Sequence, residues 1–259
     1  YFGKEFFDEK VGLMAAFLLS FFPLDVIFST RLLPDVPAAF FLSLGVFLFL
    51  KGEKEKIIAK RNITYIFSGL AMGIAYLIKE IVALIAVFFL VYVLFYRKIK
   101  WSYLLLGIGP VLCLLIGLYL FWINTGDPLF GFQSFDSYWD FAINERGSWG
   151  RDTFPMLLFH FPHLVVTDFN FGLFYSFIPL AFLYFLYFKK KAAHPFLIWG
   201  ISLLAYISFG SASITRYAPI PGVSRYLMIV TIPTMLILAL FLREKNLAIK
   251  KVIMPSILT

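Results

Sequence analysis

The sequence has few of the residues on which common soluble-protein chemistries depend. Its 259 residues include one cysteine, Cys113, so neither a disulfide framework nor a thiolate metal site is available. Neither a GxxxxGK[ST] loop nor a GxGxxG pattern occurs, which leaves nucleotide hydrolysis and dinucleotide chemistry without support. Charged residues make up only 15% of the chain, whereas about a quarter is typical of soluble domains. These absences leave a soluble nucleotide-dependent enzyme and a cysteine-based metal site without support.

Apolar residues are present in excess instead. They form 61% of the chain, the mean hydropathy is +0.87, and they occur in runs separated by short charged clusters. This pattern is typical of helices that cross a bilayer. The sequence therefore predicts an all-α, polytopic transmembrane bundle in a single membrane domain over residues 1–259, with eight spans at 11–30, 36–50, 63–78, 81–96, 102–123, 171–188, 195–212 and 225–242.

The cations are distributed unevenly along this eight-span arrangement. Seventeen of the 23 Lys and Arg residues fall in five clusters on one predicted side, at residues 4–10, 51–61, 97–100, 189–191 and 243–251. The positive-inside rule makes that side cytoplasmic. We therefore interpret the net charge of +8 as a topology signal, not as a nucleic-acid patch, and predict a multi-pass plasma-membrane protein whose chemistry is extracytoplasmic.

The opposite side carries one long connection, residues 124–170, which we predict to be an extracytoplasmic loop. Its aromatic and acidic stretch contains Asp136, Tyr138, Trp139 and Asp140, side chains that suit sugar binding, although aromatic residues also populate membrane interfaces. Residues 154–169 are apolar but interrupted by two prolines, which favours a helix at the interface. His160 and His163 stand on it without an accompanying acid, so no metal site is predicted.

A charged break, Arg31-Leu32-Leu33-Pro34-Asp35-Val36-Pro37, separates the first two apolar runs. The run from Val36 to Leu50 would cover only about 22 Å, less than the hydrocarbon thickness, which predicts that Asp35 is recessed. The predicted spans 63–78 and 81–96 are also short, which predicts that Lys79-Glu80, between them, is recessed toward the same cavity. The alternative is structural: an Arg31–Asp35 ion pair beside helix-ending prolines, with Lys79-Glu80 as an ordinary interfacial turn. Asp25 receives no role.

Two arginines, Arg216 and Arg225, fall on the same predicted outer side. A guanidinium offers planar, permanently charged recognition of phosphate, so both are candidate phosphate ligands. The alternative is that they hold helix ends at the interface.

Several of these segments together resemble a known family. Tyr1-Phe2-Gly3, the Arg31–Pro37 break, Gly69-Leu70-Ala71-Met72-Gly73 with Lys79-Glu80 after it, Thr125-Gly126-Asp127-Pro128-Leu129 and Arg225-Tyr226-Leu227 are similar, in order and spacing, to the GT-C superfamily of membrane glycosyltransferases. The protein-mannosyltransferase and aminoarabinose-transferase-like families are nearest. The resemblance implies sugar transfer from a polyprenyl- or dolichyl-phosphate donor to an acceptor protein, glycan or lipid.

The resemblance also assigns roles to residues. Asp35 matches the second outer acidic motif, and Lys79 and Arg225 match residues that would meet the donor phosphate. Arg216 is a further phosphate candidate from its charge and predicted side, not from the resemblance. From side-chain type and predicted position we also expect acceptor or sugar contacts from Arg31, Glu80, Asp136, Tyr138, Trp139 and Asp140. The family's catalytic base lies on an earlier outer loop, and we expect this chain to be incomplete at both ends. The family's Leu-Thr-Lys is here Leu77-Ile78-Lys79, so a hydroxyl is lost.

Membrane lipid and the lipid-linked sugar are the expected partners, with no nucleic acid, no certain cofactor and no divalent metal. Two other classes stay open at this point. A secondary transporter would also place ionisable residues at membrane depth, but it should show inverted repeats, and none is visible. A non-catalytic lipid-binding membrane subunit is the second alternative, since the loop expected to hold the base is not in this sequence.

Overall fold

A computed structural model describes residues 1–31, 33–97, 99–134, 137–138, 153–167, 177–188, 190–211, 217–220 and 223–257. Within those ranges the secondary structure is helical apart from one isolated β-bridge between Ser211 and Pro219. The all-α prediction is confirmed. Asp136, Trp139, Asp140 and Arg216, four of the candidate site residues, lie outside the described residues.

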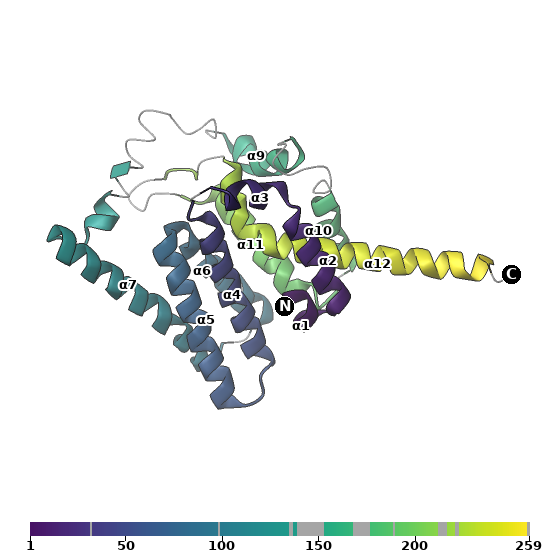
Figure 1. Cartoon of the computed structure of the whole chain (residues 1–259), viewed down its shortest axis with the longest axis horizontal. Coiled ribbons are helices and arrows are strands. Elements are labelled where there is room, and N and C mark those ends of the chain that lie inside the picture. The colour runs from purple at the N-terminus through teal and green to yellow at the C-terminus, as the bar shows by residue number, and fades with distance from the viewer. Residues whose placement is uncertain are drawn as a thin grey trace.

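Figure 1 shows the arrangement of the helices in the described part of the chain. In chain order they are α1 (Phe2–Phe6), α2 (Glu9–Ser20), α3 (Pro23–Ser29), α4 (Asp35–Lys54), α5 (Ile58–Ile78), the 3₁₀ helix η1 (Glu80–Leu84), α6 (Ile85–Tyr96), η2 (Trp101–Tyr103), α7 (Leu104–Thr125), α9 (Phe154–Thr167), α10 (Phe177–Phe188), α11 (His194–Phe209), η4 (Ser224–Val230) and α12 (Thr231–Ile257). Every predicted span coincides at least in part with one of these helices.

Length and hydropathy identify fewer crossing helices than the eight predicted spans. In the described part of the chain, three segments are long and apolar enough to cross a membrane: Asp35–Lys54, Trp101–Thr125 and Ser224–Lys245. The α2–α3 pair, bent by 60° at residues 21–22, gives a fourth if it counts as one span. Helices α6, α10 and α11 are apolar but shorter. The structure supports a membrane protein with several crossing helices, and the number eight stays a prediction.

Close packing of α5 on α7 depends on glycine (Figure 1). A Cβ atom added to Gly69 would lie 2.2 Å from the carbonyl oxygen of Leu106, and one added to Gly73 would lie 2.7 Å from that of Gly109. Only hydrogen fits at such distances, so the Gly69–Gly73 pair brings the two backbones together. Cys113 is buried in the same contact, as expected for a core residue.

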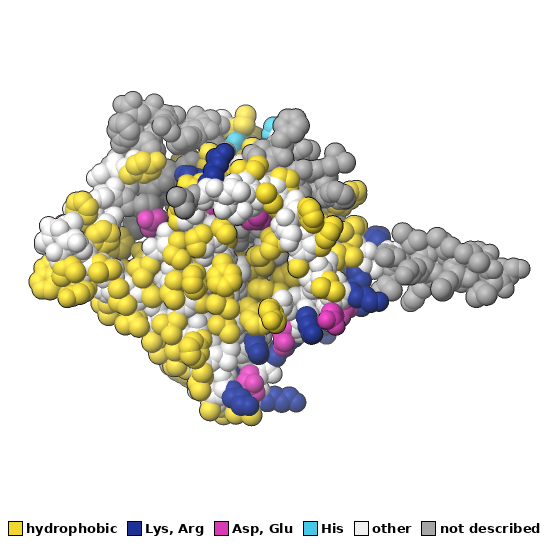
Figure 2. All heavy atoms as spheres, in the orientation of Figure 1, with side chains coloured by type: hydrophobic (Ala, Val, Ile, Leu, Met, Phe, Trp, Pro, Cys, Tyr) yellow, Lys and Arg dark blue, Asp and Glu magenta, His cyan; other side chains and the backbone are white. Residues whose placement is uncertain are grey.

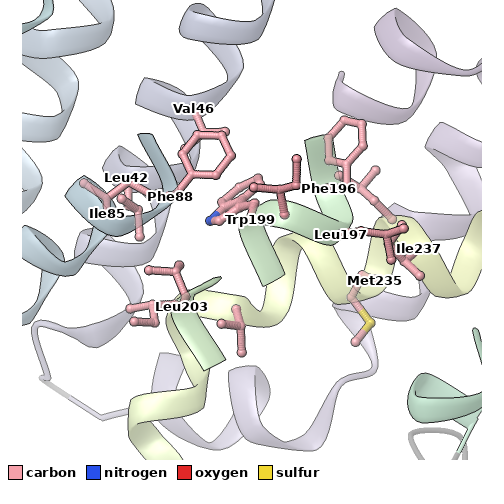
Figure 3. Close-up of a cluster of buried hydrophobic side chains, with 14 of the residues drawn as sticks. Leu42, Val46, Ile85, Phe88, Phe196, Leu197, Trp199, Leu203, Met235 and Ile237 are labelled. Carbon is pink, nitrogen blue, oxygen red and sulfur yellow. The ribbon is translucent and has the colours of Figure 1, made fainter. Parts of the chain in front are cut away.

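A cluster of large buried side chains packs α1, α6, α11 and α12 together (Figure 3). Trp199 of α11 is fully buried in its middle, with Phe88 of α6 on one side and Phe196 of α11 on the other. The rings of Phe2 and Trp199 lie 5.8 Å apart, so the short helix α1 belongs to this core. Leu197 packs beside Ile237 of α12 in the same cluster. Burial of such aromatic side chains is a large part of folding energetics.

The five basic clusters meet at one end of the bundle, which we call the basic end. Contacts tie neighbouring clusters together: Lys54 donates to the backbone carbonyl of Glu5, and Lys100 pairs with Glu53. Lys190 pairs with Glu244, and Arg243 with Asp8. On the face shown in Figure 2, Lys, Arg and carboxylate side chains gather along one margin beside a broad hydrophobic surface. The contacts therefore bring members of the five clusters together, while their place on one side of a membrane, the cytoplasmic side, stays a prediction.

Gly126 adopts a left-handed conformation (φ 78°) directly after α7 and ends that helix. Residues 154–167 form the predicted helix, α9, which runs continuously through Pro155 and Pro162 and places Phe154 against Phe209 of α11, with ring centroids 5.9 Å apart. The position of α9 at a membrane interface stays a prediction.

Candidate active site

Asp35 begins α4 and is buried, with 3% of its surface exposed. Pro34 precedes it and sets the backbone for the helix start, and a carboxylate in the first turn interacts favourably with the helix dipole. The reason for its burial differs from our prediction. Helix α4 continues to Lys54 and spans about 30 Å, so the argument from a short span is wrong. The start of α4 instead meets Lys79, which pairs with Asp35, and α4 also packs against η4.

Lys79 is the ion-pair partner of Asp35. It lies in the connection between α5 and η1, outside both helices, and its Nζ donates a hydrogen bond to Asp35 Oδ1. Burial lowers the pKa of the Lys79 ammonium, while the hydrogen bond to Asp35 acts in the opposite direction. The ammonium also lies 5.0 Å from the ring centroid of Tyr226. The predicted meeting of these two outer connections is confirmed.

The alternative pairing of Arg31 with Asp35 is not present. The Arg31 guanidinium instead lies over the ring of Phe28, 5.6 Å from its centroid. It lines a separate pocket of about 540 Å³, which Arg225 also borders. Arg31 is therefore close to the Asp35 region without contributing to its ion pair.

A cavity of about 600 Å³ opens beside the Asp35–Lys79 pair. It brings together five of the predicted site residues, which are Asp35, Lys79, Glu80, Tyr138 and Arg225. Apolar side chains of α7, among them Leu114, Leu118 and Phe121, form another part of its wall. The cavity thus combines a charged region with a hydrocarbon-like surface, a combination suited to a ligand with an anionic group and an apolar chain.

Arg225 reaches this cavity from the first turn of η4. Its guanidinium carbon lies 5.4 Å from the Tyr226 ring centroid, and its Nε is buried without a hydrogen-bond partner in the described part of the chain. An unsatisfied buried donor is costly unless a ligand or water completes it. Together with Lys79, Arg225 therefore supplies positive charge and free donor capacity at the cavity wall.

Sequence reasoning overlooked two tyrosines. Tyr226 is buried between Lys79 and Arg225, and Tyr76 of α5 lines the same cavity. In the sequence Tyr226 directly follows Arg225, a candidate phosphate ligand, and this position could have identified Tyr226 as a site residue.

Metal-ligating groups do not converge among the described residues. No group of three or more His, Cys, Asp or Glu side chains is present there. His163 lies on α9, where its Nδ1 is 3.2 Å from the hydroxyl of Thr167.

The fold and cavity define a class first: a helical membrane protein with a buried carboxylate–lysine pair beside a cavity that is charged on one side and apolar on another. Comparison with known families then narrows this class of protein. Residues 1–123 match the family described as dolichyl-phosphate-mannose-protein mannosyltransferase. The matched segment contains Asp35 and Lys79 but not Arg225. The comparisons matched neither a curated protein nor a solved structure to the chain.

This match confirms the family resemblance over the N-terminal 123 residues. It supports a membrane glycosyltransferase of the mannosyltransferase type. The side of the membrane, the donor and the acceptor are not defined by it.

Proposed function

We propose that the protein transfers a sugar from a polyprenyl- or dolichyl-phosphate donor to an acceptor on the extracytoplasmic face of the plasma membrane. The observation that carries this proposal is the shared cavity of Asp35, Lys79 and Arg225 beside an apolar wall. A lipid-linked sugar phosphate has a matching pair of features, an anionic phosphate and a long hydrocarbon chain.

Lys79 and Arg225 would hold the donor phosphate, with Arg216 as a third candidate. As the bond between the anomeric carbon and the phosphate oxygen breaks, negative charge grows on the departing lipid phosphate. Cations held in place before the reaction stabilise that charge more effectively than water does. The buried position of Lys79 and the unpartnered Nε of Arg225 suit this task.

The acceptor hydroxyl oxygen would form the new bond to the anomeric carbon, and its proton would pass to a carboxylate. The resemblance makes Asp35 the second acidic motif and not that base, so we assign Asp35 the orientation of Lys79 and the acceptor. A single displacement of this kind inverts the anomeric carbon. Glu80 and Tyr138 line the cavity and are proposed to bind the sugar or acceptor.

Arg31 is proposed to contact the acceptor from its neighbouring pocket. Asp136, Trp139 and Asp140 keep the same proposed role on sequence grounds alone.

The site assignment is tested by Asp35→Asn and Lys79→Ala. Membranes containing each variant are supplied with a polyprenyl-phosphate sugar, and transfer is measured per amount of folded protein. We expect both variants to lose transfer, while Lys10→Ala, which removes an exposed cation at the basic end, retains it. Wild-type-like transfer by both Asp35→Asn and Lys79→Ala would sink the assignment. A wild-type protein that binds the donor without transferring its sugar would favour the non-catalytic lipid-binding alternative.

Cysteine labelling tests the predicted side of the membrane. Cys113 is buried and gives little background. A cysteine at Ser137 should react with an impermeant maleimide from outside the cell, and one at Lys191 should not. The reverse pattern would overturn the orientation.

A further inference from the structure

A second hydrophobic cavity, separate from the Asp35 cavity, lies between α6 and α11. Its volume is about 670 Å³, and its wall is almost entirely apolar. Val87, Val91 and Phe95 line it from α6 at every fourth residue, so they form one stripe along that helix. Helix α11 supplies the facing wall, which includes Ile201 and Ala205. We call this cavity the α6–α11 groove.

The groove is long and open at the side. Its lining on α11 runs from His194 to Gly210, which corresponds to about 24 Å along the helix axis. Phe95, Leu186 and Ile201 are exposed although they line it, so the groove faces the surroundings of the bundle. In a bilayer those surroundings are hydrocarbon chains. A chain that enters the groove would cover apolar surface along most of one helix.

The His194 end of the groove lies at the basic end of the bundle. Phe95 and His194 close it with an edge-to-face ring contact, 5.6 Å between centroids. Arg97 follows α6 two residues after Phe95, and Lys190 and Lys191 lie just before α11. Lys190 is paired with Glu244, but Arg97 and Lys191 are exposed and form no ion pair with the described residues. Two cations without an ion-pair partner among the described residues thus follow or precede the helices that form this end of the groove.

We propose that the α6–α11 groove binds an anionic phospholipid, with one acyl chain along Val87, Val91 and Ile201 and the headgroup phosphate between Arg97 and Lys191. Charge complementarity selects this occupant. A zwitterionic lipid fills the groove equally well but brings no net negative charge to the two cations. Each basic residue near a membrane surface is expected to favour an anionic lipid about fivefold. The site is independent of the sugar-transfer proposal, since it shares no lining residue with the Asp35 cavity.

The test measures lipid binding to the purified full chain in detergent by native mass spectrometry. Dioleoylphosphatidylglycerol and dioleoylphosphatidylcholine are titrated separately. We expect the anionic lipid to bind at least tenfold more tightly, and the double variant Arg97→Gln/Lys191→Gln to reduce that ratio to about threefold or less. The matched control, Lys10→Gln/Lys56→Gln, removes the same net charge from exposed positions elsewhere at the basic end and should leave the ratio unchanged.

The hydrocarbon part of the proposal is tested by filling the groove. Ile201→Trp should weaken binding of both lipids, and the smaller Ala205→Leu serves if the tryptophan variant does not fold. Lys79→Ala should bind both lipids like the wild type, which separates this site from the transfer site. Equal binding of the two lipids, or a preference that survives Arg97→Gln/Lys191→Gln, would overturn the proposal. So would a groove that prefers polyprenyl phosphate to phosphatidylglycerol.

Discussion

Helix α4 carries a buried carboxylate near each end, and the two invite comparison. Asp35 starts the helix and Glu53 lies one residue before its last. Each pairs with a lysine from a distant connection, Lys79 for Asp35 and Lys100 for Glu53. The carboxylate side chains are only 2% and 8% exposed, respectively. Both are carboxylate–lysine pairs, although the Lys100 side chain is 28% exposed and that of Lys79 13%.

Their surroundings differ. Glu53 accepts hydrogen bonds from the Lys100 ammonium at 2.8 and 3.0 Å, from the Tyr103 hydroxyl at 3.0 Å, and from the Tyr65 hydroxyl. Rings of Phe49, Tyr65 and Tyr103 pack together around it. This network joins α4, α5 and η2. A carboxylate satisfied by so many donors has little capacity left for a ligand, and its role is to hold the helices together.

Asp35 and Lys79 instead lie beside a 600 Å³ cavity that Arg225 and Glu80 also line. Their charges are close to space that a substrate could occupy. Burial of an ion pair therefore does not by itself indicate function. What distinguishes the two pairs is the number of donors already used and the presence of an adjoining cavity.

The largest expected effect is on activity, when the two lysines are compared. Lys79→Gln should reduce the rate of sugar transfer by about 100- to 1,000-fold, because it removes a cation that stabilises the leaving phosphate. Lys100→Gln should leave the rate per folded molecule within a few-fold of wild type. Initial rates in membranes, normalised to folded protein, measure both. Similar losses for the two variants would remove the functional distinction between the pairs.

The next largest effect is on stability, and here the Glu53 substitution is expected to cost more than the Asp35 substitution. Glu53→Gln removes one partner of a buried pair, which costs about 3–5 kcal/mol. Asp35→Asn should cost less, because water in the adjoining cavity can solvate the Lys79 ammonium. Thermal unfolding in detergent compares the two variants under identical conditions. If Asp35→Asn is the more destabilising substitution, the Asp35–Lys79 pair is mainly structural.

The close contact between α5 and α7 gives a smaller expected effect on the free energy of unfolding. Gly69→Ala places a methyl group against the Leu106 carbonyl and should cost about 1–3 kcal/mol through forced separation of α5 and α7. Gly107→Ala is the matched control, since a Cβ there meets nothing within 4 Å. That control should be neutral or stabilising by up to about 1 kcal/mol from helix propensity. Equal unfolding temperatures for the two variants would contradict the close packing.

The smallest effect concerns one hydroxyl of the Glu53 network. Tyr65→Phe removes one of several donors to Glu53 while keeping the ring, so a loss of about 1 kcal/mol is expected. Transfer activity should not change, because the network lies at the basic end, away from the cavity. Parallel unfolding and transfer assays on the same preparation check both statements. A loss of transfer without a loss of stability would link the two ends of α4.

Much of this fold followed from local features of the sequence. Apolar runs predicted the helices because helices satisfy backbone polar groups inside a bilayer, and the position of the basic clusters predicted a common end. The Gly69–Gly73 spacing is typical of close helix packing, but the structure was needed to identify α7 as the partner helix. The convergence of Asp35 with Lys79 was also predicted, although the reason offered for it, a short span, was wrong because α4 extends through Lys54.

The sequence by itself determined the helical membrane class, the basic end and the family likeness of residues 1–123, because hydropathy, charge spacing and short motifs are properties of neighbouring residues. Only the tertiary structure decided that Asp35 pairs with Lys79 and not with Arg31, which is nearer in the sequence. Only the tertiary structure also decided that the Glu53 carboxylate is surrounded by hydrogen-bond donors, whereas Asp35 adjoins a cavity. Those outcomes depend on how helices far apart in the chain pack together. Side-chain partners across such contacts are set by distance and desolvation in three dimensions, which no local pattern records.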